Sequence, residues 1–115
     1  MQTDPRRAHV RRLLQVDASI GDEHGSQQWA VQIIDIARMG VAFVSHHQFP
    51  CDVPFLFSFC FPGSSVRNEV LLTIVHGVPV GTEGRIRYGA RFLSIADDVV
   101  ERIVDYVTSG AMLMA

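Results

Sequence analysis

The sequence predicts an all-β domain, a six-stranded antiparallel β-barrel with a C-terminal α-helix that covers one opening or flank. Short apolar runs recur between turn-forming clusters along most of the chain, whose 115 residues support one domain of ordinary size. Apolar residues adopt helical spacing only once, after residue 94. A closed barrel leaves so small a sheet with no unpaired edge strand, and an open sandwich is the alternative architecture.

Three predicted strands occupy the first half of the chain. The apolar run at residues 13–20 ends in a turn-forming cluster at residues 21–26. Residues 29–34 form the second strand, which leads directly into the segment 35–40. Residues 41–45 are the third short apolar run, so the connection between the second and third strands is tight.

The clearest strand lies in residues 55–61, and Pro54 limits where it begins. Four phenylalanines fall on one of its faces at a period of two: Phe55, Phe57, Phe59 and Phe61. Each contributes about 1.5–3 kcal/mol when buried, so this row is expected to form much of the core. The continuous apolar run at residues 70–75 predicts the fifth strand.

The sixth predicted strand, residues 85–92, has two different faces. One face is apolar and carries Ile86, Tyr88, Ala90 and Phe92. The opposite face carries three arginines: Arg85, Arg87 and Arg91. Such a face borders either an anionic ligand or solvent, and solvent is the default interpretation.

The last predicted element is a helix. Ser94 to Asp97 has the form of a capping box, and apolar residues follow at helical spacing: Val99, Val100, Ile103, Val104 and Val107. Gly110 is expected to end this helix. The chain is therefore divided into an N-terminal arm (residues 1–12), a barrel domain with the helix (residues 13–110) and a tail (residues 111–115).

Composition and charge argue against several classes of function. A net charge of −2 argues against a general DNA- or RNA-binding protein, which is normally basic over a whole face. Cys51 and Cys60 are too few and wrongly spaced for a zinc site or a disulfide-rich scaffold. No apolar run reaches the roughly 18 residues that cross a bilayer, and no signal peptide or catalytic motif stands out. We therefore expect a cytoplasmic protein without membrane insertion, enzymatic activity, bound metal or cofactor.

The first candidate binding segment is an arginine cluster. Four of the ten cationic residues lie within seven positions: Arg6, Arg7, Arg11 and Arg12. Like charges held close together repel, so the cluster favours an anionic partner, with a solvated basic arm as the alternative. A planar guanidinium donates paired hydrogen bonds to phosphate or to the N7 and O6 edge of guanine, and it stacks on flat rings.

The second candidate segment is residues 35–40, where the second predicted strand ends. The Asp35 carboxylate can accept the N1–H and N2–H of a guanine, which arginines cannot do because they only donate. Gly40 would allow either a positive φ or the close approach of a ligand. An ordinary β-turn shaped by an aspartate and a glycine is the alternative.

Together, the two segments resemble the two signatures of PilZ domains, which are bacterial receptors for the second messenger cyclic di-GMP. Residues 7–11 have the form RxxxR, and residues 35–40 are similar to (D/N)xSxxG. Residues 84–92 and the helix after them look like the family's closing strand and C-terminal helix. The resemblance covers roughly residues 5–107, and it implies a PilZ-like split barrel that carries cyclic di-GMP on its outer surface.

The resemblance implies a role for each arginine of the cluster. Arg7 and Arg11 match the RxxxR arginines, which contact guanine and phosphate groups, and the N-terminal arm would fold over the ligand as a switch. Arg6 and Arg12 flank this motif and are expected to assist.

In the second segment, the resemblance implies that Asp35 and Gly40 contact guanine. Ala37 departs from the pattern because it stands where the family has a serine. Losing one hydrogen bond costs about 0.5–1.5 kcal/mol, which weakens binding without abolishing it.

The expected function is a stand-alone cyclic di-GMP receptor, in the kind of signalling that controls motility and biofilms. Its expected partners are cyclic di-GMP and a downstream protein, and we expect a monomer or a weak homodimer. One alternative is a PilZ-fold interaction module for type IV pili or motility that binds no nucleotide. A small DNA- or RNA-binding barrel is the less favoured alternative.

Overall fold

The computed structural model describes residues 10–114, and the side chains of residues 10–109. This part of the chain consists of seven strands and one helix: β1 (Arg11–Leu13), β2 (Asp17–Asp22), β3 (Gln28–Ala37), β4 (Gly40–Ser45), β5 (Pro54–Phe59), β6 (Asn68–Val80), β7 (Arg85–Ser94) and α1 (Asp97–Met114).

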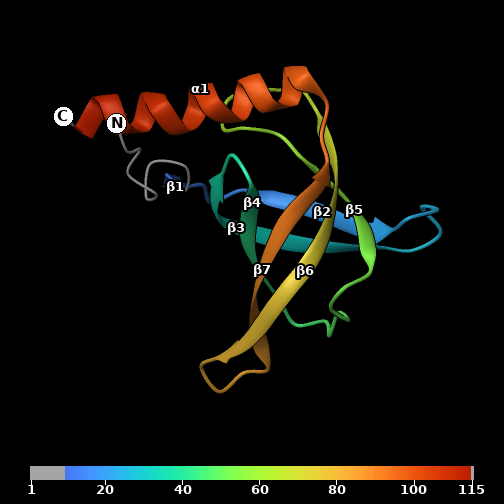
Figure 1. Ribbon diagram of the computed structural model, residues 1–115. Coiled ribbons are helices and arrows are strands. Elements are labelled where there is room, and N and C mark those ends of the chain that lie inside the picture. The colour runs from blue at the N-terminus through green and yellow to red at the C-terminus, as the bar shows by residue number, and fades with distance from the viewer. Residues whose placement is uncertain (1–9, 115) are drawn as a thin grey trace, which may run out of the picture.

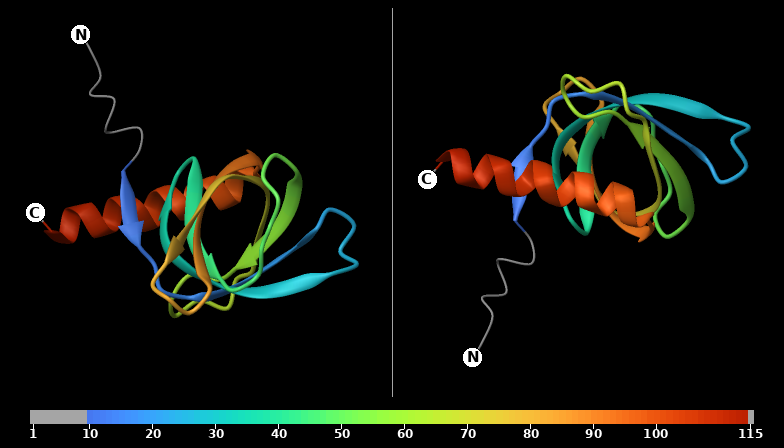
Figure 2. Two further views of the ribbon diagram at one scale, coloured as in Figure 1. Left: turned by 90° about the horizontal axis from the view of Figure 1, so that it is seen from below. Right: turned by 90° about the horizontal axis from the view of Figure 1, so that it is seen from above.

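Strands β2 to β7 close into a six-stranded antiparallel barrel, in the order β2, β3, β4, β7, β6, β5 and back to β2. In Figure 1, α1 lies across one end of the barrel, and the β6–β7 hairpin projects from the other. The predicted fold class is confirmed, with one additional strand. That strand, β1, pairs with β3 and lies beside the barrel under α1 (Figure 2).

The prediction of a single strand over residues 13–20 is wrong, because β1 and β2 are separate. Both pair with the same edge of β3, β2 along its first half and β1 along its second. The register slips by one residue between the two pairings, and Leu14 sits at the break with its side chain 1% exposed. Burying Leu14 therefore interrupts the strand but keeps the chain along β3.

The barrel interior is filled by the inward faces of the strands. The predicted phenylalanine row is confirmed for Phe55, Phe57 and Phe59, which are buried, while Phe61 lies beyond β5 and is half-buried. The helix closes one end of this core with three buried side chains, Val99, Ile103 and Val107.

Both predicted ends of the helix are wrong. Ser94 is the last residue of β7, so the helix begins only at Asp97 and the expected capping box does not form. Instead, Asp97 and Asp98 place negative charge in the first turn, where the helix dipole favours it. The helix also continues through Gly110 to Met114. A helical glycine costs only about 1 kcal/mol relative to alanine, and the alanine, methionine and leucine that follow it are good helix formers.

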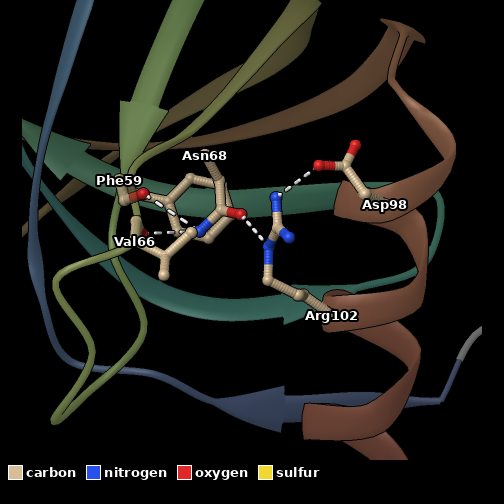
Figure 3. A network of polar contacts seen from close by, with 5 residues as sticks. All are labelled: Phe59, Val66, Asn68, Asp98 and Arg102. Carbon is tan, nitrogen blue, oxygen red and sulfur yellow. Dashed lines mark hydrogen bonds and ion pairs between the residues drawn. The ribbon is translucent and has the colours of Figure 1, made fainter.

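A polar network fixes the first half of α1 to the barrel (Figure 3). Arg102 Nε donates to the Oδ1 of the fully buried Asn68 at 2.7 Å, and the Asn68 amide donates to the Phe59 carbonyl at 3.2 Å. Arg102 Nη2 also bonds to Asp98 at 3.0 Å. This hydrogen bond, together with the charge of Arg102, lowers the pKa of the Asp98 carboxyl from its ordinary value.

Candidate functional site

A β-bulge in β3 decides where the Asp35 side chain points. Val31 and Ile33 face the core, and continued alternation would turn Asp35 inward as well. The pairing with β4 is shifted between Ile33 and Asp35, so the core row resumes at Ile36, which is fully buried. The extra residue therefore places the Asp35 carboxylate on the outer face of the barrel.

On that face, Asp35 bonds to two arginines from other strands. Arg11 Nε of β1 donates to Asp35 Oδ1 at 2.6 Å, and Arg87 Nη2 of β7 donates to Asp35 Oδ2 at 3.3 Å. The Asp35 side chain is 12% exposed, whereas those of Arg11 and Arg87 are 44% and 51% exposed. Both guanidinium groups are thus held by a sheltered anion while much of their surface remains available to a ligand.

A groove of about 540 Å³ begins at Arg11 and Arg87 and continues over the outer faces of β4, β7 and β6. Its floor follows one cross-strand row, in which Ala42 pairs with Gly89 and Gly89 with His76. Asp35 continues this row as the partner of Ala42, just outside the lining of the groove. The two central residues, Ala42 and Gly89, are small, and the His76 imidazole lies over Gly89. Three valines of the projecting hairpin also line the groove: Val75, Val78 and Val80.

His76 lies over the floor, and the sequence analysis did not identify it as a site residue. A Cβ placed on Gly89 would lie 2.6 Å from His76 Nε2, so the imidazole covers the space that a side chain at residue 89 would take. The exposed imidazole can stack on a base or bond to a polar edge. The cross-strand pairing with Gly89 is the only signal that identifies it, and that pairing requires the fold.

Arg87 corrects the default interpretation of the arginine face of β7. The alternation of arginines with apolar residues is confirmed, but Arg87 bonds to Asp35 and lines the groove. It is therefore a site residue as well as a surface charge. No signal near Arg87 in the sequence points to Asp35, which precedes it by 52 residues.

Gly40 has a structural role that differs from both expectations for it. Its φ is not among the positive values found for glycines of the described chain. A Cβ at residue 40 would overlap the carbonyl oxygen of Ala90 and lie 3.3 Å from Arg91 Cα, so β7 itself occupies the space. Gly40 thus allows β4 and β7 to approach, and the expected guanine contact receives no support from this geometry.

The predicted site residues are only partly brought together. Arg11 and Asp35 meet, and Ala37 pairs with Arg11 in the β1–β3 ladder with its methyl group 2% exposed. Arg12 points to the opposite face, where its guanidinium carbon lies 3.9 Å from the centre of the Tyr106 ring. Arg6 and Arg7, and with them most of the predicted arm, lie outside the described residues.

The family model of the PilZ domain matches residues 5–109. No protein of curated function matches the sequence. The helix of the described chain is not long and apolar enough to span a membrane.

Three solved structures illustrate the likeness in fold. The inhibitor of motility MotI of Bacillus subtilis is 14% identical with a TM-score of 0.79, and the match covers 97% of this chain but only 53% of MotI. The PilZ domain of Escherichia coli YcgR, solved with cyclic di-GMP, is 11% identical with a TM-score of 0.67, and 90% of each chain is covered. MrkH of K. pneumonia in its apo state is 12% identical with a TM-score of 0.65, and the match covers 99% of this chain and 53% of MrkH.

These identities are too low to transfer a ligand, but the family model spans nearly the whole sequence. The chain belongs to the PilZ domain family.

Proposed function

We propose that this protein is a receptor for cyclic di-GMP that binds the dinucleotide on the outer face of its barrel. The observation that carries the proposal is the contact between the two signature segments. Arg11 of the first and Asp35 of the second are 24 residues apart, yet they bond at 2.6 Å beside an open groove.

The groove offers the chemistry that cyclic di-GMP requires. Asp35 is the acceptor for the N1–H and N2–H of a guanine. Arg11 and Arg87 supply guanidinium forks for phosphate oxygens or for the opposite guanine edge, and each is about half exposed. The apolar hairpin wall and the Ala42–Gly89 floor accept the flat faces of the bases.

The proposed role is regulatory and not catalytic. A cytoplasmic receptor of this kind would pass the binding event to a downstream protein, and its output would concern motility or a related behaviour. The printed descriptions of two structural neighbours, an inhibitor of motility and a PilZ domain solved with cyclic di-GMP, support this proposal.

Isothermal titration calorimetry tests the proposal. Purified protein is titrated with cyclic di-GMP, with GTP and linear pGpG as controls, and the same is done for Arg11→Ala. Losing a charge-assisted hydrogen bond typically costs about 1.5–3 kcal/mol, so Arg11→Ala should bind about ten- to hundredfold more weakly. Arg67→Ala is the matched control, because exposed Arg67 bonds to Ser58 away from the groove.

Three outcomes distinguish the cyclic di-GMP receptor from its alternatives. Selective binding of cyclic di-GMP that is lost in Arg11→Ala and kept in Arg67→Ala supports the receptor. Absence of binding in the wild type overturns it and favours an interaction module without nucleotide. Equal affinity for oligonucleotides, falling steeply with salt, would point to a nucleic-acid-binding barrel.

A further inference from the structure

Strand β1 contacts the candidate site with one face and the helix with the other. Arg11 points outward and bonds to Asp35, whereas the next residue, Arg12, points to the other face and stacks on Tyr106. Arg12 Nη1 also donates to the Tyr106 carbonyl at 2.8 Å, and the Tyr106 hydroxyl donates to the Leu13 carbonyl at 2.8 Å. A three-residue strand thus joins the groove to the middle of α1.

Both oxygens of Asp35 are already engaged in this structure. Arg11 donates to Oδ1 and Arg87 donates to Oδ2. A guanidinium presents its N–H donors side by side, in the same way as the N1–H and N2–H of guanine. Arg11 at Oδ1 and Arg87 at Oδ2 together occupy the two oxygens that the guanine edge of the proposed ligand would need, so Arg11 acts as one part of an internal substitute for that ligand.

Few interactions keep β1 in place. Its ladder joins three residues to β3, and Leu13 is 70% exposed, so β1 itself buries little apolar surface, and the buried Leu14 anchors only the residue that follows it. Among the described residues, the other contacts of β1 are the two bonds and the ring stacking with Tyr106, together with the Arg11–Asp35 pair. Short segments with little buried surface open locally at low free-energy cost.

The helix has a second, separate attachment that does not involve β1. Arg102 in its first half is bonded to Asn68 of β6, as Figure 3 shows, and to Asp98 of its own turn. Beyond Arg102, Ile103 and Val107 are still buried in the core, whereas Tyr106 is held by β1. Loss of β1 would therefore leave α1 on the barrel but loosen its second half, which loses the contacts of Tyr106.

We propose that β1 couples the site to the helix through competition for Asp35. When the guanine edge binds Asp35, Arg11 leaves the carboxylate, β1 loosens, and Tyr106 loses its contacts with Arg12 and Leu13. The second half of α1 then becomes the element that signals ligand binding. This inference rests on the proposed function for its ligand, while the coupling between Asp35 and α1 is a property of the free protein.

The first experiment measures the coupling without any ligand. Hydrogen exchange is compared between the wild type and Asp35→Ala, which removes the partner of Arg11. Faster exchange is expected at the amides of residues 103–109, with little change at residues 98–102, which the Asn68–Arg102 network anchors. Unchanged exchange at residues 103–109 in a folded Asp35→Ala protein would overturn the coupling, whatever the ligand is.

The second experiment measures the competition. Tyr106→Phe removes the hydroxyl bond to Leu13 but keeps the ring under Arg12, so it weakens the hold on β1 without touching the groove. Because ligand binding no longer has to break that bond, the affinity for cyclic di-GMP should rise about two- to tenfold. Arg102→Gln is the matched control, since it loosens the helix at its other attachment and should leave the affinity unchanged.

The results distinguish the competition for Asp35 from the proposed binding of cyclic di-GMP. An unchanged or weaker affinity in Tyr106→Phe overturns the competition, and an equal rise in Arg102→Gln shows a general effect of helix loosening and overturns the specific role of β1. If the wild type binds no cyclic di-GMP, the proposed function fails, and the exchange measurement on Asp35→Ala still decides whether Asp35 controls α1.

Discussion

Gly40 and Gly89 both lie on the outer face of the barrel, yet the structure predicts opposite consequences when each becomes alanine. At Gly40 the three atoms nearest to the new methyl group belong to the backbone of β7, and the Ala90 carbonyl oxygen would be overlapped. No rotamer change relieves that contact, so β4 and β7 would have to move apart. At Gly89 the nearest atoms belong to the exposed His76 imidazole, which can rotate away.

These contacts set the expected magnitudes. Gly40→Ala should lower the free energy of unfolding by about 3 kcal/mol, the upper end of the usual cost of overpacking, because backbone and not side chains must yield. With a urea m-value of about 1–3 kcal/mol/M for a small domain, the midpoint should fall by about 1–3 M. Gly89→Ala should change the free energy of unfolding by less than about 1 kcal/mol, because the loss of glycine's unfolded-state entropy offsets the displacement of His76.

The effect on binding should have the reverse ranking, with the larger loss of affinity in Gly89→Ala. The methyl group of Gly89→Ala rises from the floor of the groove and displaces His76, and a loss of about 1.4 kcal/mol corresponds to tenfold weaker binding of cyclic di-GMP. Urea unfolding followed by tryptophan fluorescence measures stability, and calorimetry measures affinity at a temperature where both variants are folded. A Gly40→Ala protein that is as stable as the wild type but does not bind would refute the argument from Ala90 and restore a ligand-contacting role for Gly40.

Three further outcomes are expected. Ala37→Ser restores the family's hydroxyl and should tighten cyclic di-GMP binding about two- to tenfold in calorimetry, whereas an unchanged affinity would mean that the hydroxyl does not reach the ligand. Phe57→Ala empties a fully buried position among the phenylalanines and should lower the free energy of unfolding by about 3–5 kcal/mol in urea, a value that a loss below 1 kcal/mol would contradict. Asp98→Asn should destabilise the protein at neutral pH, because the lowered pKa means that the ionised carboxylate favours the folded state. The difference from wild type should shrink as the pH falls below about 4 and Asp98 is protonated, and a difference that grows in acid would have the wrong sign.

The sequence by itself determined most strands, the presence of one helix and the chemistry of the individual site residues, but not the division of β1 from β2 or the ends of the helix. The period-two row of phenylalanines, the two-faced strand with its arginines and the helical spacing after residue 94 are local patterns, and each became the element it predicted. The two signature segments named Arg11 and Asp35 as ligand contacts on one patch, and the two side chains meet in the structure. Donor and acceptor types are properties of individual residues, so they can be read before the chain is folded.

Tertiary structure decided which of these groups meet, because strand register is set by partners far away in the chain. The bulge before Asp35 arises in the pairing of β3 with β4, and it turns the carboxylate outward. Arg87 reaches Asp35 only because β4 and β7 are neighbours, and Arg12 leaves the site because consecutive residues of β1 face opposite sides. The arginine cluster that is continuous in the sequence is therefore divided, with Arg11 at the groove and Arg12 on the helix.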